Sequence, residues 1–134
     1  MIVVDASVLV AGLADDGPDG DRVRERLRAE RLVAPHVIDH EVVSAWRRLA
    51  AAGDLDDRRA TLALADLAAR RLERVPHAPL VDRCWELRHD LTVYDAAYVA
   101  LAELMGVTLV TGDVRLAGAP GTRCDVEVVG WAPK

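Results

Sequence analysis

Short apolar runs alternate with longer segments of helical periodicity along the chain, and this alternation restricts the folds open to it. Strands are predicted at five apolar runs, over residues 1–4, 32–34, 72–75, 107–110 and 126–129. Strands that are separated by helices pair in parallel, because each crossover returns the chain to the starting edge of the sheet. The pattern therefore predicts an α/β fold, with a central, mostly parallel sheet and helices on both faces.

The segments between these runs have the apolar spacing of amphipathic helices. Helices are predicted over residues 6–13, 22–31, 36–52, 55–71, 80–89 and 93–104. Residues 15–21 contain Gly17, Pro18 and Gly20, a composition that predicts a turn. One predicted helix, over residues 55–71, is expected to turn four side chains inward: Leu62, Leu64, Ala65 and Ala68.

The length and net charge of the chain limit the classes of protein to which it can belong. With 134 residues, it is predicted to form a single domain over residues 1–134. A net charge of −5 excludes binding to nucleic acid through bulk positive charge, but leaves room for a local basic patch. No membrane span or signal peptide is recognised, so a cytoplasmic protein is expected. Cys84 and Cys124 form no metal-binding motif and are expected to be reduced, with a disulfide left open.

Two aspartates directly follow predicted strands. Asp5 ends the run over residues 1–4, and Asp113 follows the strand over residues 107–110. Ligands of open α/β sheets bind beyond the carboxyl ends of the strands, so both carboxylates are expected at the ligand-binding edge. An aspartate at such a position also caps the next helix, and for either residue alone both interpretations stay open.

Glu41 interrupts the apolar stripe of the helix predicted over residues 36–52. It lies four residues from both Val37 and Ala45, and each step of four turns only about 40° around the helix axis. A buried, unpaired carboxylate costs several kcal/mol, so it needs a cation, hydrogen-bond donors or a proton. The alternative is a partly buried glutamate paired with an arginine.

Asp95 lies one turn into the helix predicted over residues 93–104. The small residues Ala96, Ala97 and Ala100 around it permit close approach of other elements. Thr92 and Asp95 also have the spacing of a capping box, so a purely local capping role is an alternative.

The four acidic residues together point to a metal site. Two unit charges 4 Å apart repel by about 4 kcal/mol at an effective dielectric constant of 20, so several carboxylates in one cleft need a cation. Carboxylate oxygens suit Mg²⁺, or Mn²⁺ in its place. Ser7 and Thr111, each two residues from an acid, are expected to hydrogen-bond the carboxylates or bound water, although local capping explains them equally well.

Four segments also carry a resemblance to a known family. They are residues 1–7 (MIVVDAS), Glu41 on the helix after Pro35, residues 94–102 (YDAAYVALA), and residues 111–113 (TGD). In order and spacing they resemble the PIN-domain ribonucleases, and within them the VapC-type toxins of bacterial toxin–antitoxin modules. The resemblance extends over the whole chain.

This resemblance implies a PIN-like three-layer sandwich with an acidic Mg²⁺ site at Asp5, Glu41, Asp95 and Asp113. It further implies metal-dependent cleavage of RNA, a homodimer, and a cognate antitoxin that blocks the site. Asp5, Asp95 and Asp113 are the expected metal ligands, and Glu41 completes the site as a ligand or by orienting water. The number of metal ions stays open.

Other interpretations remain for the function and for several side chains. A PIN-fold binding module without turnover, or another metal-dependent phosphate hydrolase, fits the same acids. Arg115, close to Asp113, is either a phosphate contact or an ordinary surface arginine. The remaining side chains singled out are aromatic, and all three are expected in the core or an interface: Trp46, Trp85 and Tyr98.

Overall fold

The computed structural model describes residues 1–130. Within these residues, one sheet has the strand order β3-β2-β1-β4-β5, and every neighbouring pair is parallel. The strands are β1 (Ile2–Val4), β2 (Leu32–Pro35), β3 (Glu73–Val75), β4 (Leu109–Thr111) and β5 (Val126–Val128). The predicted α/β fold is confirmed, and each predicted strand is present with small shifts at its ends. The single domain over residues 1–134 stays a prediction, and its last four residues lie outside the described part.

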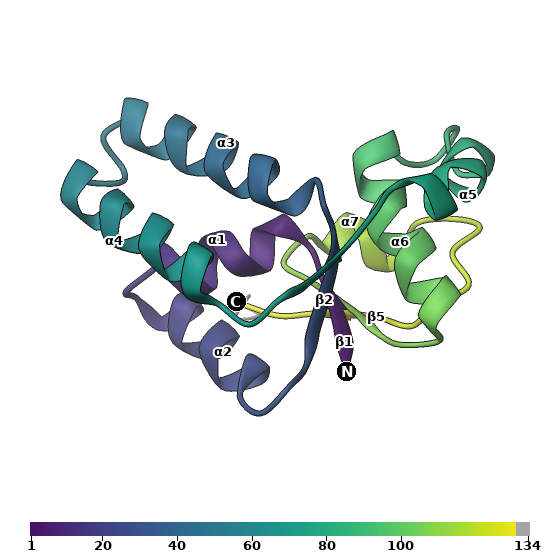
Figure 1. Cartoon of the computed structure of the whole chain (residues 1–134), viewed down its shortest axis with the longest axis horizontal. Coiled ribbons are helices and arrows are strands. Elements are labelled where there is room, and N and C mark those ends of the chain that lie inside the picture. Colours follow the sequence, from purple (N-terminus) through teal and green to yellow (C-terminus); the bar gives the residue numbers. More distant parts are fainter. Residues whose placement is uncertain (131–134) are drawn as a thin grey trace.

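Helices cover both faces of this sheet (Figure 1). The helices on one side are α1 (Ala6–Ala14), α2 (Pro18–Leu27), α3 (Ile38–Ala51) and α4 (Asp57–Ala69). The remaining helices are η1 (Ala78–Leu80), α5 (Val81–Glu86), α6 (Val93–Met105) and α7 (Val114–Ala117). Figure 1 shows α5 and α6 on the opposite side of the sheet from α3 and α4, which confirms the three layers.

The central strands and α6 form the core. Val3, Val4 and Val110 are completely buried, as expected for parallel strands that are covered on both faces. Every residue of α6 from Ala96 to Ala102 is buried, and the alanines among them let this helix approach the sheet closely. The helix ends at Met105, and Gly106 after it has a φ of 66°, which glycine readily adopts.

The helices differ from the prediction at their ends, and two of them differ most. The helix predicted over residues 22–31 is α2, which begins at Pro18 and ends at Leu27, so residues 18–21 are helical and do not form a turn. Pro18 suits the first turn of a helix because its φ is already fixed and its missing N–H would have no partner there. The helix predicted over residues 80–89 is split into η1 and a short α5.

The inward face of α4 was wrongly predicted. Leu62, Leu64, Ala65 and Ala68 are all exposed, whereas Ala63 and Leu67 are buried. Ala63 and Leu67 are four residues apart, so they form the narrow stripe along which α4 packs. The composition of α4 does not reveal this stripe, because apolar residues occur on most of its circumference.

Two smaller expectations concern the cysteines and the membrane. Cys84 and Cys124 are free thiols in the described structure, so the disulfide that the sequence left open is not formed. Among the described residues, no helix combines the length and apolar character that a membrane crossing requires.

Candidate active site at the carboxyl edge of the sheet

Asp5 follows β1 and is buried at this edge, with 6% of its surface exposed. Its carboxylate caps α1 by accepting the N–H of Val8, so the capping interpretation is correct. The hydroxyl of Ser7 donates to Oδ1 at 2.5 Å, and the hydroxyl of Thr111 donates to Oδ2. Burial raises the pKa of Asp5 to about 6, although these hydrogen bonds oppose the shift.

Ser7 and Thr111 join the end of β1 to the end of β4. Besides donating to Asp5, the hydroxyl of Thr111 accepts the N–H of Asp113 at 3.0 Å, and the hydroxyl of Ser7 accepts the N–H of Gly112 at 2.9 Å. A Cβ atom at Gly112 would lie 3.1 Å from the Ser7 oxygen, so glycine permits this close approach. Both hydroxyls therefore hydrogen-bond a carboxylate, as expected, and fix where it lies.

Asp113 caps α7 and pairs with Arg115. Its Oδ1 accepts the N–H of Arg115 at 2.9 Å, and the guanidinium forms a salt bridge with Oδ2 at 2.8 Å. This pairing lowers the pKa of Asp113. The Arg115 side chain is 84% exposed, so its contact with a phosphate stays a prediction.

Asp95 occupies the first turn of α6 and is partly buried. Its N–H donates to the hydroxyl of Thr92, the N-cap residue, at 3.1 Å, which confirms the predicted cap. Burial raises the pKa of Asp95, and the negative charge of Asp113 raises it further, whereas Thr92 and Arg115 oppose the shift. A purely local cap does not explain why a second carboxylate lies within electrostatic reach.

Glu41 lies in the first turn of α3 and is half-buried. The hydroxyl of Tyr98 donates to Oε1 at 2.5 Å, and no salt bridge involves Glu41 among residues 1–130. The partner is therefore a tyrosine on α6, and pairing with an arginine is wrong. Burial raises the pKa of Glu41, the hydrogen bond with Tyr98 lowers it, and the charge of Asp95 raises it.

Tyr98 is a contributor to the site that the sequence analysis missed. It was expected in the core or an interface, and its side chain is indeed buried. It lies three residues after Asp95, so both side chains fall on one side of α6. That spacing was the available signal, but its partner Glu41 is 57 positions away in the sequence.

Asp95 connects the four acidic residues electrostatically. Its charge raises the pKa of Asp5 and of Glu41, and the charge of Asp113 raises that of Asp95. Within the described chain, no cluster of three or more histidine, cysteine, aspartate or glutamate side chains is close enough to hold a metal ion. The binding of Mg²⁺ at these four residues therefore stays a prediction.

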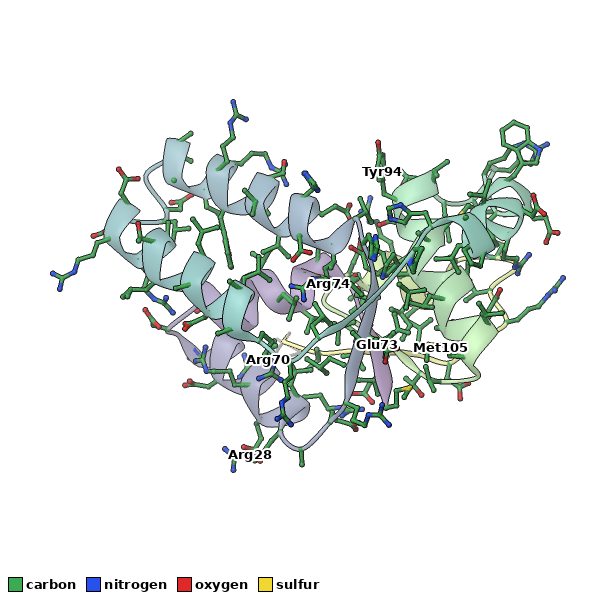
Figure 2. All side chains as sticks on the ribbon, in the orientation of Figure 1. Arg28, Arg70, Glu73, Arg74, Tyr94 and Met105 are labelled. Carbon is green, nitrogen blue, oxygen red and sulfur yellow. The ribbon has the colours of Figure 1, made fainter. Side chains whose placement is uncertain are left out.

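Two contacts fix the first turn of α3, which carries Glu41. Arg74 of β3, which is labelled in Figure 2, forms a bidentate salt bridge with Asp39, with Nε–Oδ2 at 2.6 Å and Nη2–Oδ1 at 2.9 Å. The imidazole of His77 accepts the N–H of Val37 at 3.0 Å. Arg74 belongs to β3, and His77 belongs to the segment after it. Because both contact the start of α3, they position the helical turn that carries Glu41.

The surface beside Glu41 is hollowed. Glu41, Ser44 and Arg48 line a shallow hollow of about 270 Å³, whose wall includes Tyr94. Tyr94 also lines an adjoining apolar cavity of about 290 Å³ together with Trp85. The Trp85 side chain is exposed and stacks with the guanidinium of Arg88 at 4.1 Å, so it is not a core residue.

Comparisons with known proteins assign the family. The family model for the PIN domain matches residues 2–121. The chain is 42% identical over 128 residues to "Ribonuclease VapC1" of Mycobacterium tuberculosis, covering 95% of this chain and 96% of the relative. It is 44% identical over 132 residues to "Ribonuclease VapC9" of the same organism, covering 96% and 98%.

Solved structures share the fold. The PAE2754 protein from Pyrobaculum aerophilum has a TM-score of 0.67 and 30% identity, covering 95% of this chain and 83% of that one. The DNA-bound VapBC structure from Salmonella typhimurium has a TM-score of 0.69 and 14% identity, covering 95% and 96%. Together with the order of strands and the acidic edge, these comparisons show that the chain belongs to the PIN-domain family and, within it, to the VapC ribonucleases.

Proposed function

We propose that this protein is a Mg²⁺-dependent endoribonuclease that hydrolyses RNA phosphodiester bonds as the toxin of a toxin–antitoxin pair. The observation that carries the proposal is that Asp5 and Asp113 follow β1 and β4 at the carboxyl edge of the sheet, and that Asp95 is electrostatically coupled to both of them and to Glu41. Identity of 42–44% to proteins named ribonucleases supports the reaction class.

Asp5, Asp95 and Asp113 would hold Mg²⁺, or Mn²⁺ in its place. A bound divalent ion supplies positive charge against the phosphodiester and lowers the pKa of coordinated water. The pKa values of Asp5 and Asp95 are raised by burial and by neighbouring negative charge. A nearby cation favours the ionised form of such carboxylates. The burial and the neighbouring negative charge that raise these pKa values without a metal would therefore favour the binding of a metal ion.

The other side chains hold the carboxylates in place. Ser7 and Thr111 each donate to one oxygen of Asp5, which fixes the plane of its carboxylate. Tyr98 holds one oxygen of Glu41, and the other oxygen, which forms no hydrogen bond within residues 1–130, would bind the ion or orient water. Arg115, exposed beside Asp113, is the cation best placed to reach a phosphate from the surface.

The proposed partners follow from the family. A cognate antitoxin would cover the acidic edge, and a second copy of the chain would form a homodimer in the cytoplasm. The structures of VapBC from Salmonella typhimurium and of VapBC2 from Rickettsia felis have this fold, each with a TM-score of 0.69. The apolar cavity at Tyr94 and Trp85 offers a surface beside the site for such contacts.

Cleavage of total cellular RNA by the purified protein, with Mg²⁺ or with EDTA, tests the proposal. We expect discrete products with Mg²⁺ only, and none from Asp95→Asn. Asp90→Asn is the matched control, because Asp90 is an exposed acid shortly before the same helix. Equal cleavage by the Asp95 and Asp90 variants would refute the site.

Two results would replace the proposed function with another. Intact RNA together with a stable protein partner would identify a binding module without turnover. Intact RNA with hydrolysis of small phosphate esters would identify a different phosphate hydrolase. Mapping the ends of RNA products gives the cleavage site directly.

A further inference from the structure

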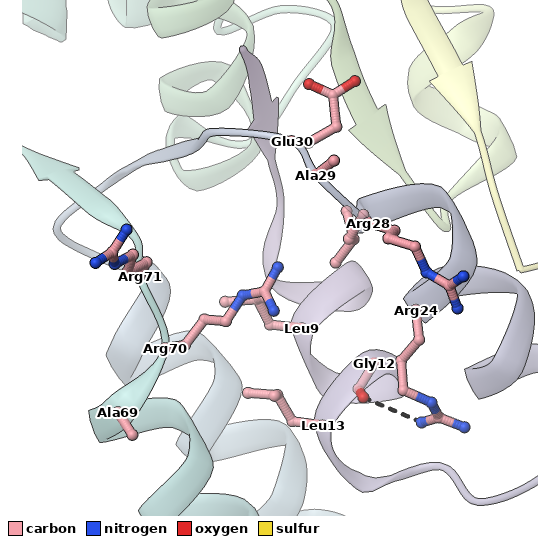
Figure 3. Close-up of a pocket in the computed structure, with 11 residues that line it drawn as sticks. Leu9, Gly12, Leu13, Arg24, Arg28, Ala29, Glu30, Ala69, Arg70 and Arg71 are labelled. Atoms are coloured by element: carbon pink, nitrogen blue, oxygen red, sulfur yellow. Dashed lines mark hydrogen bonds between the residues drawn. The ribbon is translucent and has the colours of Figure 1, made fainter.

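A second cavity lies at the opposite edge of the sheet from the acidic residues. It has a volume of about 670 Å³ and is formed by α1, the end of α2 and the end of α4 (Figure 3). The ends of α2 and α4 lead into the amino ends of β2 and β3, whereas the acidic site lies at the carboxyl ends. The cavity is therefore separate from the candidate active site.

The walls of this cavity combine apolar and cationic side chains. Leu9, Leu13 and Leu27 form an apolar wall. Its charged lining consists of one glutamate and four arginines: Glu30, Arg24, Arg28, Arg70 and Arg71. A volume between about 300 and 1,000 Å³ with an apolar wall and a few polar groups is typical of sites for small organic ligands.

Three of the charged groups are already neutralised by partners. Arg24 forms a salt bridge with Asp21 at 2.6 Å, and Arg28 forms one with Glu25 at 2.9 Å. The carboxylate of Glu30 binds the guanidinium of Arg26 and the amino terminus. These groups contribute little net charge to the cavity.

The other two arginines of the lining, Arg70 and Arg71, are not neutralised in this way. In the described part of the chain neither forms a salt bridge, and the buried Nε of Arg70 has no hydrogen-bond partner. Figure 3 shows the Arg70 side chain leaving the chain at the end of α4 and reaching toward Leu9 of α1. A buried donor without an acceptor is costly, and a ligand that accepts from it removes that cost.

We propose that this cavity binds a phosphate monoester whose organic group packs against the leucine wall. A phosphate monoester carries a charge of about −1.5 to −2 at pH 7, which matches the two unpaired guanidinium groups. Arginine also presents several donors in a plane that fits phosphate oxygens. A monocarboxylate would leave one of the two charges unbalanced. The proposal is independent of the function assigned to the acidic edge.

Calorimetric titration of the full chain with AMP, inorganic phosphate, adenosine and succinate tests the ligand class. We expect AMP to bind, phosphate to bind more weakly because it lacks the organic group, and adenosine not to bind. Affinity for AMP should fall at least about tenfold in Arg70→Gln and in Arg71→Gln, as expected for loss of a charged hydrogen bond. Arg58→Gln, which changes an exposed arginine in the first turn of α4, is the control and should bind AMP like the wild type.

Thermal unfolding provides a second readout for Arg70. Without ligand, Arg70→Met should be at least as stable as the wild type, because the unpaired buried donor is gone. AMP should raise the melting temperature of the wild type and leave that of Arg70→Met unchanged.

Any of three results would overturn the proposal: no AMP binding at about 10 mM, equal affinity in all variants, or succinate binding as tightly as AMP. A marked loss of stability in Arg70→Met would overturn it too, since Arg70 would then serve the fold.

Discussion

The hydroxyl of Tyr98 donates a hydrogen bond to Oε1 of Glu41 across 2.5 Å and thereby joins α6 to α3 beside the acidic edge. Tyr98 is 1% exposed, and burial together with the carboxylate of Glu41 raises its pKa far above the ordinary value. The phenol therefore stays protonated and acts as a permanent donor. Because the bond lowers the pKa of Glu41 against the effect of burial, it keeps this carboxylate more readily ionised.

Removing this hydroxyl gives the first expected outcome. In Tyr98→Phe the ring still fills the core, but Glu41 loses its donor, so its pKa rises further. We expect RNA cleavage at neutral pH to fall by about tenfold, which corresponds to about 1.4 kcal/mol. The acidic limb of the pH–rate profile should move to higher pH. Initial rates of RNA cleavage measured from pH 5 to pH 9 check both effects.

The matched control is Tyr94→Phe. Tyr94 is an exposed residue of the same helix whose hydroxyl has no hydrogen bond among the described residues, so its removal should leave the profile unchanged. A Tyr98→Phe profile that overlays the wild type would show that the contact serves only packing.

Asp5 makes the stability of the metal-free protein depend on pH. Its pKa of about 6 in the folded state lies above the ordinary value of 3.8, so the folded protein binds more protons between these values. Stability from this group is full below pH 3.8 and is lost as pH rises through about 6. At one unit per 1.36 kcal/mol, the loss is on the order of 3 kcal/mol.

Asp5→Asn removes this ionisable group. At pH 7, with EDTA present, we expect the variant to be more stable than the wild type, and at pH 4 we expect the two to differ little. Urea unfolding of both proteins at the two pH values measures the difference. If the difference in unfolding free energy between the two proteins is the same at both pH values, the ionisation of Asp5 does not cause that difference.

Much of the fold follows from local patterns that the sequence displays. The run that forms β1 is apolar on every residue because the strand is covered on both faces, and it ends at Asp5, where the chain leaves the core. The glycine after α6 ends that helix in the left-handed conformation. Such signals depend on neighbouring residues, so the order of strands and helices was predictable.

The parts that were not predictable depend on distant contacts. The stripe by which α4 packs is set by where α1 and α3 lie, and propensity cannot distinguish Ala63 from Leu62. At the site, burial of Glu41 was foreseen from its place in an apolar stripe, but its partner was not. Tyr98 reaches it only because the fold brings two helices together.

Asp95→Asn should separate stability from activity. The charge of Asp95 raises the pKa of both Asp5 and Glu41, so removing it relieves repulsion in the metal-free site. We expect the variant to unfold at a higher urea concentration than the wild type at pH 7 in EDTA. Added Mg²⁺ should stabilise the wild type and have at least about tenfold lower affinity for the variant. A Mg²⁺ titration that is identical for both proteins would exclude Asp95 as a ligand.

Among residues 1–130, the most buried ion pair joins Arg83 of α5 to Glu103 of α6, away from the site. Arg83 donates from Nε to Oε1 at 2.7 Å and from Nη2 to Oε2 at 3.1 Å, and the two side chains are only 18% and 12% exposed. Nη2 also donates to the carbonyl of Gly121 at 2.7 Å, so the pair anchors the segment before β5.

Arg83→Met leaves a mostly buried carboxylate unpaired, and we expect a loss of about 2 kcal/mol of unfolding free energy in urea. Arg28→Met, which breaks an exposed pair, should cost less than about 0.5 kcal/mol. Equal losses in the two variants would mean that burial adds nothing to the Arg83 pair.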